Sequence, residues 1–361
     1  MPRPIRASIS ASALVHNLTV ARRHAGDTKL WAVIKANAYG HGVERAARAL
    51  AAADGFAVLD LQEALRLRAA GVAKPVLLLE GFFAAGDLEL VTKHALTPVI
   101  HNPEQVEILK RTALAGDLDV YLKVNSGMNR LGFGVDGLRP AYNELRMHPR
   151  VKNVTLMTHF ADADGAGGIK AQLDWFNELA QPFEVAGRSL ANSAALMRFP
   201  EARGDWARPG IMLYGCSPFG HMSASQSAGA LGLKPVMTLT SEIIATQHLE
   251  PGERVGYGFA YQAVGEMTIG VVACGYADGY PRHAPIGTPV LVSGKRTRIV
   301  GRVSMDMITV DISDIPEAYI GTPVTLWGEG LSADEVGAAA GTLSYELLVK
   351  VTARVPVVEA P

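Results

Sequence analysis

A lysine at the end of an apolar run is the first residue of this chain whose setting favours chemistry. In the stretch WAVIKANAYGHG, residues 31–42, the first four residues predict a buried strand, and Lys35 follows them directly. A lysine amine that is partly removed from water loses its proton more easily and becomes a nucleophile, as a Schiff base requires. Tyr39 comes four residues later, about one helical turn along the chain. A lone lysine at a strand end is more often a surface group, so further residues have to decide between the two roles.

Ser193 ends the seventh predicted strand, and the stretch RPG, residues 208–210, begins the eighth. In a barrel of parallel strands, the loops after the last two strands commonly hold a phosphate through backbone N–H groups and hydroxyls. Gly210 lets the backbone approach an anion closely, and Ser193 can donate a hydroxyl. An imine-forming lysine and a phosphate cradle at one barrel mouth favour pyridoxal 5'-phosphate (PLP) as the cofactor.

Two further patterns do not predict sites. Residues 132–137, GFGVDG, fit the spacing GxGxxG, but they do not join a strand to a helix as a dinucleotide-binding unit requires. A loop is the better interpretation. His41 has no partner at metal-ligand spacing, so no metal site is expected.

Composition and charge narrow the class of protein. The chain has 361 residues, of which 48% are hydrophobic, enough for a large core and one or two domains. Its 34 basic and 35 acidic residues give a net charge of −1, which predicts neither a nucleic-acid partner nor an anionic membrane surface. Cys216 and Cys274 lie far apart, as in a protein of a reducing compartment. The N-terminal stretch lacks the apolar core of a secretory signal, so a soluble, cytoplasmic protein is expected.

Alternating strand and helix patterns fill the first two thirds of the chain. Eight apolar runs predict strands, each followed by a plausible helix: residues 30–36, 55–60, 75–80, 96–101, 119–125, 154–160, 188–193 and 208–215. Eight such units favour a (β/α)₈ barrel of the TIM type, with a doubly wound sheet of fewer strands as the alternative.

The pattern changes after about residue 232. Five stretches between residues 234 and 330 predict strands joined by Gly/Pro turns without helices between them. Two short helices are expected at 332–341 and 344–355. Residues 3–10 predict a strand that could join this second domain as an extra edge. The expected domains are a PLP-binding barrel at 9–232 and a β-rich domain at 233–361 together with 1–8.

Several long motifs occur in order from one end of the chain to the other. They are WAVIKANAYGHG, YLKVNSGMNRLGFG, THFADAD, NSAA, RPGIMLYG, RVGYGFAY, GYADGYPR, GRVSMDM and TLSYEL. With them the chain closely resembles alanine racemase, a fold-type III PLP enzyme, over essentially its full length. The resemblance implies a barrel followed by a β-rich domain, as the strand pattern also predicts.

The resemblance assigns the cofactor-binding residues. Lys35 matches the lysine that holds PLP as an internal aldimine. The phosphate-binding positions of the family match Tyr39, Ser193, Gly210, Ile211 and Tyr345. Without the resemblance, Tyr39 would be interpreted as an ordinary amphipathic tyrosine at the edge of the core. Tyr345 would be interpreted as part of a helix start, because Ser344 to Glu346 has the residues of one.

The resemblance also assigns two catalytic bases. Racemisation removes the α-proton from one face of a planar centre and returns a proton to the other, so one base cannot easily serve both faces. Lys35 would serve the face from which D-alanine loses its proton, and Tyr257 the face of L-alanine. His159 resembles the residue that is hydrogen-bonded to that tyrosine, whose phenol titrates near pH ~10 when free.

Arg208 matches the residue that faces the pyridine nitrogen of PLP. Arginine keeps its proton at any working pH, so it does not readily pass one to that nitrogen. The cofactor ring should then be a weaker electron sink, which disfavours decarboxylation and transamination. Related barrel decarboxylases carry an acidic residue at this position.

The remaining assignments concern the substrate. Arg130 matches the arginine near the substrate carboxylate. Lys123 matches a lysine that is often carbamylated in the family, and the carbamate then holds that arginine in place. The alternative is that Lys123 is unmodified and pairs with a carboxylate. Asn125 and Asn129 replace an acidic residue and a glycine of the family pattern, as in catabolic-type members. Met305 resembles the residue whose backbone N–H receives the substrate carboxylate. A narrow access corridor is matched by Asp164, Tyr276, Arg282, Arg302 and Asp306.

The expected function is the interconversion of L-alanine and D-alanine by a homodimer with shared active sites. Two alternatives stay open: a PLP-dependent barrel decarboxylase, which Arg208 argues against, and a PLP carrier without catalysis, which the second domain and Tyr257 argue against.

Overall fold

The computed structural model describes residues 3–219 and 224–360. The chain forms two compact units. The barrel unit comprises Asn17–Ala38 and Gly42–Leu213, and the sheet unit comprises Met1–His16, Tyr39–His41 and Tyr214–Pro361.

Eight parallel strands close into a barrel, which confirms the predicted fold class. In chain order they are β2 (Lys29–Val33), β3 (Gly55–Val58), β4 (Val76–Leu78), β5 (Leu96–Ile100), β6 (Leu118–Lys123), β7 (Val151–Met157), β8 (Gly187–Ser189) and β9 (Trp206–Ala207). The barrel closes where β9 pairs with β2, with Trp206 opposite Lys29 and Ala207 opposite Leu30. In every strand but β8 and β9, nearly all residues are buried, which explains the continuous apolar runs in the sequence.

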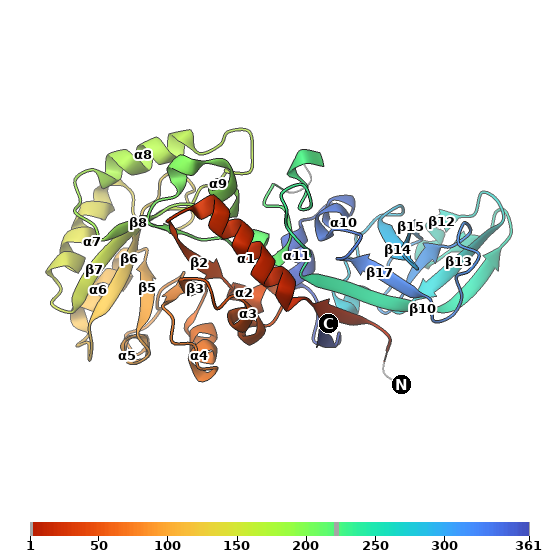
Figure 1. Ribbon diagram of the computed structural model, residues 1–361, viewed down its shortest axis with the longest axis horizontal. Coiled ribbons are helices and arrows are strands. Elements are labelled where there is room, and N and C mark those ends of the chain that lie inside the picture. Colours follow the sequence, from red (N-terminus) through yellow and green to blue (C-terminus); the bar gives the residue numbers. More distant parts are fainter. Residues whose placement is uncertain (1–2, 220–223, 361) are drawn as a thin grey trace. The chain divides into compact units, whose positions relative to one another are not determined.

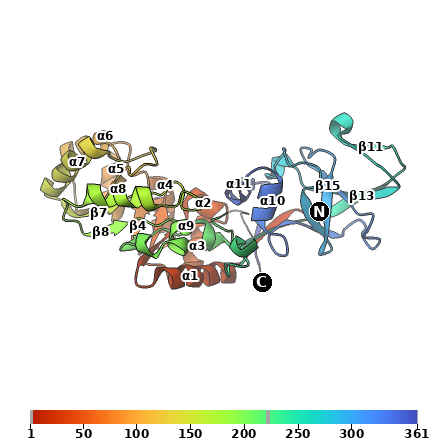
Figure 2. The ribbon, with the colours of Figure 1, turned by 90° about the horizontal axis from the view of Figure 1, so that it is seen from above.

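Helices cover the outside of the barrel (Figures 1 and 2). The helices of this part of the chain are α1 (Ala11–Ala25), α2 (Lys35–Tyr39), α3 (Val43–Ala49), α4 (Leu61–Ala69), α5 (Asp87–Lys93), α6 (Pro103–Arg111), α7 (Val135–Met147), α8 (Lys170–Ala180) and α9 (Ser193–Arg198), with short 3₁₀ helices η1 (Pro200–Ala202) and η2 (Ile211–Tyr214). Four of them begin with a side-chain cap, in which Ser10, Asp60, Asn102 or Asn192 accepts a backbone N–H from the first turn.

Aromatic side chains fill the interior of the barrel. The ring of Trp31 stacks on Trp206, with centroids 4.3 Å apart, and meets Tyr121 edge-on at 6.1 Å. The indole N–H of Trp31 donates to the Tyr121 hydroxyl at 2.9 Å. On β3, a Cβ at Gly55 would lie 2.2 Å from the Trp31 ring, so only glycine leaves room for that indole.

The last two predicted barrel strands are wrong in their limits. The seventh, expected at 188–193, ends at Ser189, because Asn192 caps helix α9 and Ser193 is its first residue. The eighth, expected at 208–215, consists of Trp206 and Ala207 alone, and residues 211–214 form η2 instead. Pro209 has no N–H for a strand ladder, so the apolar run after it does not continue the strand.

The sheet unit contains an eight-stranded, mostly antiparallel sheet in the order β13-β16-β15-β14-β17-β10-β1-β18. Its strands are β1 (Arg6–Ile9), β10 (Met237–Leu249), β13 (Met267–Val272), β14 (Pro289–Val292), β15 (Lys295–Val300), β16 (Ile308–Asp311), β17 (Pro323–Trp327) and β18 (Val357–Glu359). The N-terminal strand predicted at residues 3–10 does join this sheet, since β1 pairs antiparallel with β10 and parallel with β18. The two expected helices are α10 (Ala333–Ala339) and α11 (Ser344–Val349).

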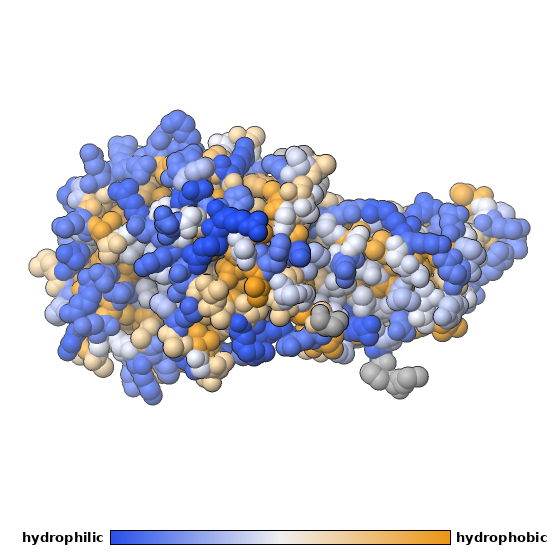
Figure 3. Space-filling view, in the orientation of Figure 1, coloured by the Kyte–Doolittle hydropathy of each residue, from blue (hydrophilic) through white to orange (hydrophobic). Residues whose placement is uncertain are grey.

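In the described part of the chain, no helix is both long and apolar enough to span a membrane. The face in Figure 3 is mostly hydrophilic, with apolar groups scattered between the polar ones.

Candidate active site

Lys35 lies just beyond β2, at the carboxyl-terminal end of the barrel, and its side chain is half-buried. Burial lowers the pKa of its amine, and the nearby Arg130 guanidinium lowers it further, while Glu80 and Glu63 act in the opposite direction. The amine therefore loses its proton at a lower pH than an exposed lysine does. A nucleophilic role in imine formation needs this property.

The turn after Lys35 is left-handed. Ala36, Asn37, Ala38 and Tyr39 have φ angles of 53°, 52°, 55° and 51°, whereas a right-handed helical turn would have negative values. The left-handed helix costs roughly 1–2 kcal/mol per residue for side chains other than glycine. Such strain is held by its surroundings and clusters at functional sites.

Arg208 directly follows β9 and is 5% exposed. Its guanidinium donates to the Thr158 carbonyl at 2.6 Å, the Ser189 hydroxyl at 2.7 Å and the Leu190 carbonyl at 3.1 Å. Burial lowers the pKa of Arg208 to about 10, so the group remains a cation at neutral pH. These acceptors fix the guanidinium plane and compensate for its burial.

Burial and the charge of Arg208 lower the pKa of two further residues at the same barrel mouth. Lys123, at the end of β6, is 8% exposed, and burial together with Arg208, Arg130 and Lys35 lowers its pKa to about 8. Burial and then Arg208 hold the pKa of His159 well below its ordinary value, so its imidazole is neutral at pH 7. The His159 Nδ1 lies 3.5 Å from the Arg208 guanidinium. The barrel mouth thus brings together Lys35, Lys123, Arg130, His159 and Arg208 as a cationic group around one neutral imidazole.

The two asparagines that depart from the family pattern form a compact loop before Arg130. Asn129 has a φ of 56°, a conformation in which glycine is the usual residue and asparagine the best-tolerated substitute. The Asn125 side-chain oxygen accepts the N–H groups of Gly127 and Asn129. Asn125 also donates to the Asn129 side-chain oxygen at 3.0 Å. Both substitutions therefore fit the loop.

The predicted phosphate positions of the barrel unit lie together. The Gly210 N–H donates to the Ser193 hydroxyl at 2.8 Å, so the proton of that hydroxyl remains available to an anion. Ile211 is the first residue of η2, next to Gly210. Both Ser193 and Ile211 therefore present donors where two chain segments meet.

The other two phosphate positions belong to the sheet unit. Tyr39 and Tyr345 have ring centroids 6.0 Å apart, and Tyr39 also stacks on Tyr214 at 4.6 Å. The Nδ1 of buried His41 lies 2.9 Å from the Tyr39 carbonyl oxygen. Burial raises the pKa of Tyr39, so its hydroxyl keeps its proton and can donate.

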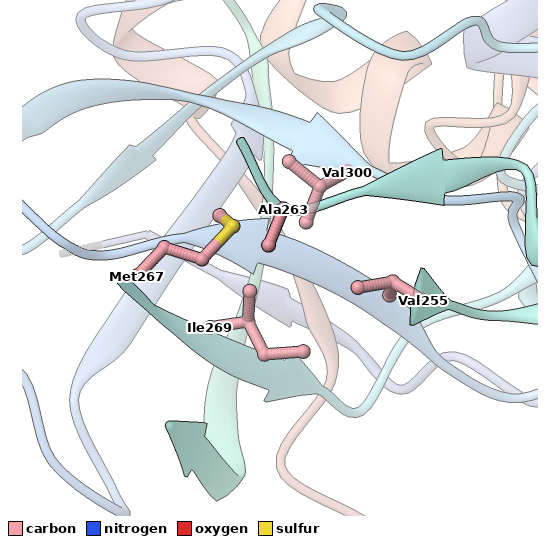
Figure 4. Close-up of a cluster of buried hydrophobic side chains, with 5 residues drawn as sticks. All are labelled: Val255, Ala263, Met267, Ile269 and Val300. Atoms are coloured by element: carbon pink, nitrogen blue, oxygen red, sulfur yellow. The ribbon is translucent and has the colours of Figure 1, made fainter. Parts of the chain in front are cut away.

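Tyr257 lies at the tip of a small hairpin that the sequence patterns did not predict. The hairpin pairs β11 (Arg254–Val255) with β12 (Tyr261–Gln262), and η4 (Tyr257–Phe259) joins them. Tyr257 is 75% exposed. A cluster of buried apolar side chains packs the base of the hairpin against the sheet (Figure 4): Val255, Ala263, Met267, Ile269 and Val300. The hairpin thus holds an exposed phenol on a packed support.

Tyr276 and Met305 come from two loops that pack against each other. The turn η5 (Tyr276–Asp278) donates the Tyr276 N–H to the Ser304 carbonyl and the Ala277 N–H to the Met305 carbonyl, both at 3.0 Å. A Cβ at Gly275 would lie 2.3 Å from the Met305 carbonyl oxygen, so this contact requires glycine. Met305 itself is 52% exposed.

The other residues of the predicted corridor are polar groups near the surface. Arg282 and Arg302 are exposed, and Asp306 is half-exposed and pairs with Arg354 at 2.7 Å. Asp164 is exposed in the barrel unit.

The η5 turn is anchored by a buried carboxylate that sequence reasoning did not single out. Asp278 is fully buried and pairs with Arg3 at 2.8 Å and with Arg354 at 3.3 Å, and it accepts the Gly275 N–H at 2.9 Å.

We predict that Asp278→Ala lowers the free energy of unfolding by about 1.5–3 kcal/mol, because a charged hydrogen-bond acceptor is lost while the half-exposed arginines can rehydrate. Urea unfolding measures this loss, and exposed Asp314→Ala is the control. Equal midpoints for the two variants would contradict the anchoring role.

Sequence reasoning also missed residues that support the barrel site. Thr158 and Ser189 hold Arg208, and Glu63 accepts the N–H of Asn37 in the left-handed turn. Ser189 carries a usable signal, since polar residues at the carboxyl ends of barrel strands are often functional. The contact of Glu63 depends on loop geometry and leaves no local pattern.

The barrel with a buried cationic group at its carboxyl-terminal end, followed by a separate sheet unit, defines a two-domain barrel enzyme. Family models described as "Alanine racemase, N-terminal domain" and "Alanine racemase, C-terminal domain" match residues 9–218 and 236–359. The chain belongs to the alanine racemase family.

Individual relatives agree with this assignment. A curated alanine racemase of Nitrosospira multiformis is 55% identical over 98% of this chain and 99% of its own length. One from Ralstonia nicotianae is 54% identical over 100% of this chain and 96% of its own. The crystal structure of the biosynthetic alanine racemase of Pseudomonas aeruginosa has a TM-score of 0.96 and 49% identity, covering 99% of this chain and 100% of that one.

Proposed function

We propose that this protein interconverts L-alanine and D-alanine with PLP held on Lys35 and with Lys35 and Tyr257 as the two bases. The observation that carries the proposal is the half-buried Lys35, whose pKa is lowered, at the end of the first barrel strand in a chain that matches curated alanine racemases over nearly its full length.

The residues of the barrel mouth fit PLP. A depressed lysine pKa suits covalent capture of an aldehyde, and the free proton of the Ser193 hydroxyl beside Gly210 and Ile211 suits a phosphate. Tyr39 and Tyr345 would add phenolic donors. When bound, PLP supplies the electron sink that makes the α-proton of an amino acid acidic.

Arg208 favours a racemase over a decarboxylase. It stays protonated at neutral pH and already gives its hydrogen bonds to Thr158, Ser189 and Leu190. A guanidinium held in this way orients its partner without handing over a proton. If Arg208 faces the pyridine nitrogen of PLP, that nitrogen would stay unprotonated, and the cofactor ring would withdraw electrons only weakly.

The two bases have different requirements. Lys35 can accept a proton once its amine is released, because burial has lowered its pKa. Tyr257 needs a neighbour that accepts a hydrogen bond from its phenol, and the neutral imidazole of His159 can do this. Arg130 and the Met305 N–H would bind the substrate carboxylate. Asp164, Tyr276, Arg282, Arg302 and Asp306 would line the access corridor.

A homodimer with shared active sites accounts for the exposure of the sheet-unit residues. Tyr257 and Met305 are 75% and 52% exposed, which is unusual for a base and a substrate-binding residue in a complete active site.

We expect Lys35→Ala and Tyr257→Ala each to be inactive alone. Mixed under conditions that exchange subunits, they should regain activity, because half of the sites in each heterodimer carry neither change. Each variant exchanged with itself is the control, and a mixture that stays inactive after verified exchange would contradict shared sites.

Lys123 is proposed to carry a carbamate. Its neutral amine would attack CO₂, forming an N–C bond and releasing one proton, and the product carboxylate would hold Arg130. Because its pKa is about 8, about half of the amines are neutral at pH 8, against about 0.4% for a lysine of pKa ~10.4. At fixed CO₂ pressure, the carbamate should therefore increase as the pH rises through 8. A ¹³C carbamate signal in labelled bicarbonate, lost in Lys123→Ala, would report it. If no ¹³C carbamate signal is seen at pH 9, Lys123 is an unmodified lysine and the proposal is wrong.

The activity is tested by incubating the PLP-loaded protein with L-alanine and separating the products on a chiral column. D-alanine in equal amount at equilibrium is expected. Ethylamine and CO₂ would instead identify a decarboxylase, and unchanged L-alanine would identify a carrier.

The buried, free cysteines Cys216 and Cys274 support a cytoplasmic location.

A further inference from the structure

The left-handed turn after Lys35 needs an external support. None of its four residues with positive φ is a glycine, so local preference opposes the conformation. Part of the support comes from nearby backbone: the Ala38 N–H donates to the Ile34 carbonyl, and the Gly42 N–H donates to the Asn37 carbonyl, both at 2.9 Å. The remaining support comes from side chains.

Glu63 links the turn to the start of helix α4. One of its carboxylate oxygens accepts the Asn37 N–H at 2.9 Å, and the other accepts the Leu59 N–H at 3.0 Å. Its own N–H donates to Asp60, the cap of α4, at 3.0 Å. Glu63 is thereby fixed at its backbone and at both oxygens.

Asn37 passes this support to the next helix. Its side-chain oxygen accepts the Val43 N–H at 3.1 Å, at the start of α3, and lies 3.4 Å from the Arg66 guanidinium. Arg66 also pairs with Glu44 of α3. The turn is therefore tied to α3 through Asn37 and to α4 through Glu63.

We propose that Glu63 is a positioning residue for Lys35, which keeps the ε-amine in register at the end of β2 by holding the left-handed turn through the Asn37 N–H. The inference rests on the proposed function, since it concerns how readily Lys35 captures the PLP aldehyde. It adds to that function a residue outside the reacting groups.

The chemistry of the two oxygens sets the design of the test. Glu63 faces two N–H donors, and a glutamine has one carbonyl oxygen and one NH₂ group, so Glu63→Gln satisfies one donor and opposes the other at nearly unchanged volume. Glu63→Asp keeps the charge, but its shorter side chain does not span both donors. Glu44→Gln removes a neighbouring carboxylate that pairs with Arg66 and accepts no bond from the turn backbone in the described residues, which makes it the matched control.

Cofactor capture is measured by adding PLP to each apoprotein, following the visible absorbance, and locating the borohydride-fixed lysine by peptide mapping. Wild type and Glu44→Gln should bind alike. Glu63→Gln and Glu63→Asp should bind roughly tenfold to a hundredfold more weakly, the loss expected for one hydrogen bond to a charged group. Their apoproteins should unfold at temperatures close to that of the control.

Hydrogen exchange of the peptide around Asn37 in the apoproteins tests the clamp without PLP. Faster exchange in both Glu63 variants than in Glu44→Gln is expected. Unchanged exchange and unchanged PLP binding in Glu63→Gln would overturn the inference and leave the proposed function standing. If Glu63→Asp alone matches wild type, charge and not position is what matters, and the inference is again wrong. A wild type that takes up no PLP would overturn both.

Discussion

Lys35→Ala is expected to lose the covalent attachment of PLP and to lose racemisation. The variant removes both the amine that would capture the cofactor and one of the two bases, and loss of a positioned base alone costs about 10²–10⁴-fold in rate. The visible absorbance of the PLP-loaded protein and the chiral assay measure the two losses separately. Small primary amines added to the variant should restore part of the proton transfer, because the space and the surrounding charges remain.

Lys29→Ala is the matched control for this experiment. Lys29 stands at the first position of the same strand, exposed, with its amine 5.4 Å from the centroid of the Trp206 ring. It should keep both absorbance and activity. A borohydride-reducible bond between PLP and the Lys35→Ala protein would show that another lysine is the attachment site, with Lys123, whose pKa is lowered by burial and by the charges around it, Lys35 included, as a candidate.

Tyr257→Phe is expected to reduce exchange of the α-proton of L-alanine strongly and to spare much of the exchange of D-alanine. The phenylalanine ring keeps the packing of the hairpin and lacks the hydroxyl, so only the face served by Tyr257 loses its base. The loss on that face should be about 10²–10⁴-fold.

Steady-state turnover cannot distinguish the two faces in this variant. Both enantiomers have the same free energy, so kcat/KM must be equal in the two directions whichever base is lost. Exchange with heavy water, followed by proton NMR of each enantiomer before it converts, does separate the faces. Tyr261→Phe, on strand β12 of the same hairpin, is the control. Equal loss of exchange for L- and D-alanine would assign Tyr257 a role other than base on one face.

The barrel was predictable from local patterns. Strands β2 to β7 are buried nearly throughout and therefore appear as continuous apolar runs. The antiparallel strands of the second unit appear as runs joined by Gly/Pro turns. The errors fall at the last two barrel strands, where Asn192 and Pro209 end the ladder earlier than hydrophobicity predicts. Capping and a missing N–H outweigh an apolar run there.

For the site, the sequence by itself identified the amine of Lys35 and the imidazole of His159 at the ends of predicted strands. It identified the guanidinium of Arg208 too, but at the start of a predicted strand, whereas in the structure Arg208 follows the end of β9. Only the tertiary structure decided how these groups are held and charged. Arg208 takes its acceptors from Thr158 and Ser189, 50 and 19 residues away, and the turn after Lys35 is contacted by Glu63, 26 residues from Asn37. Residue periodicity records burial along one element, whereas hydrogen bonds and the depression of a lysine pKa arise between elements that only the closed barrel brings together.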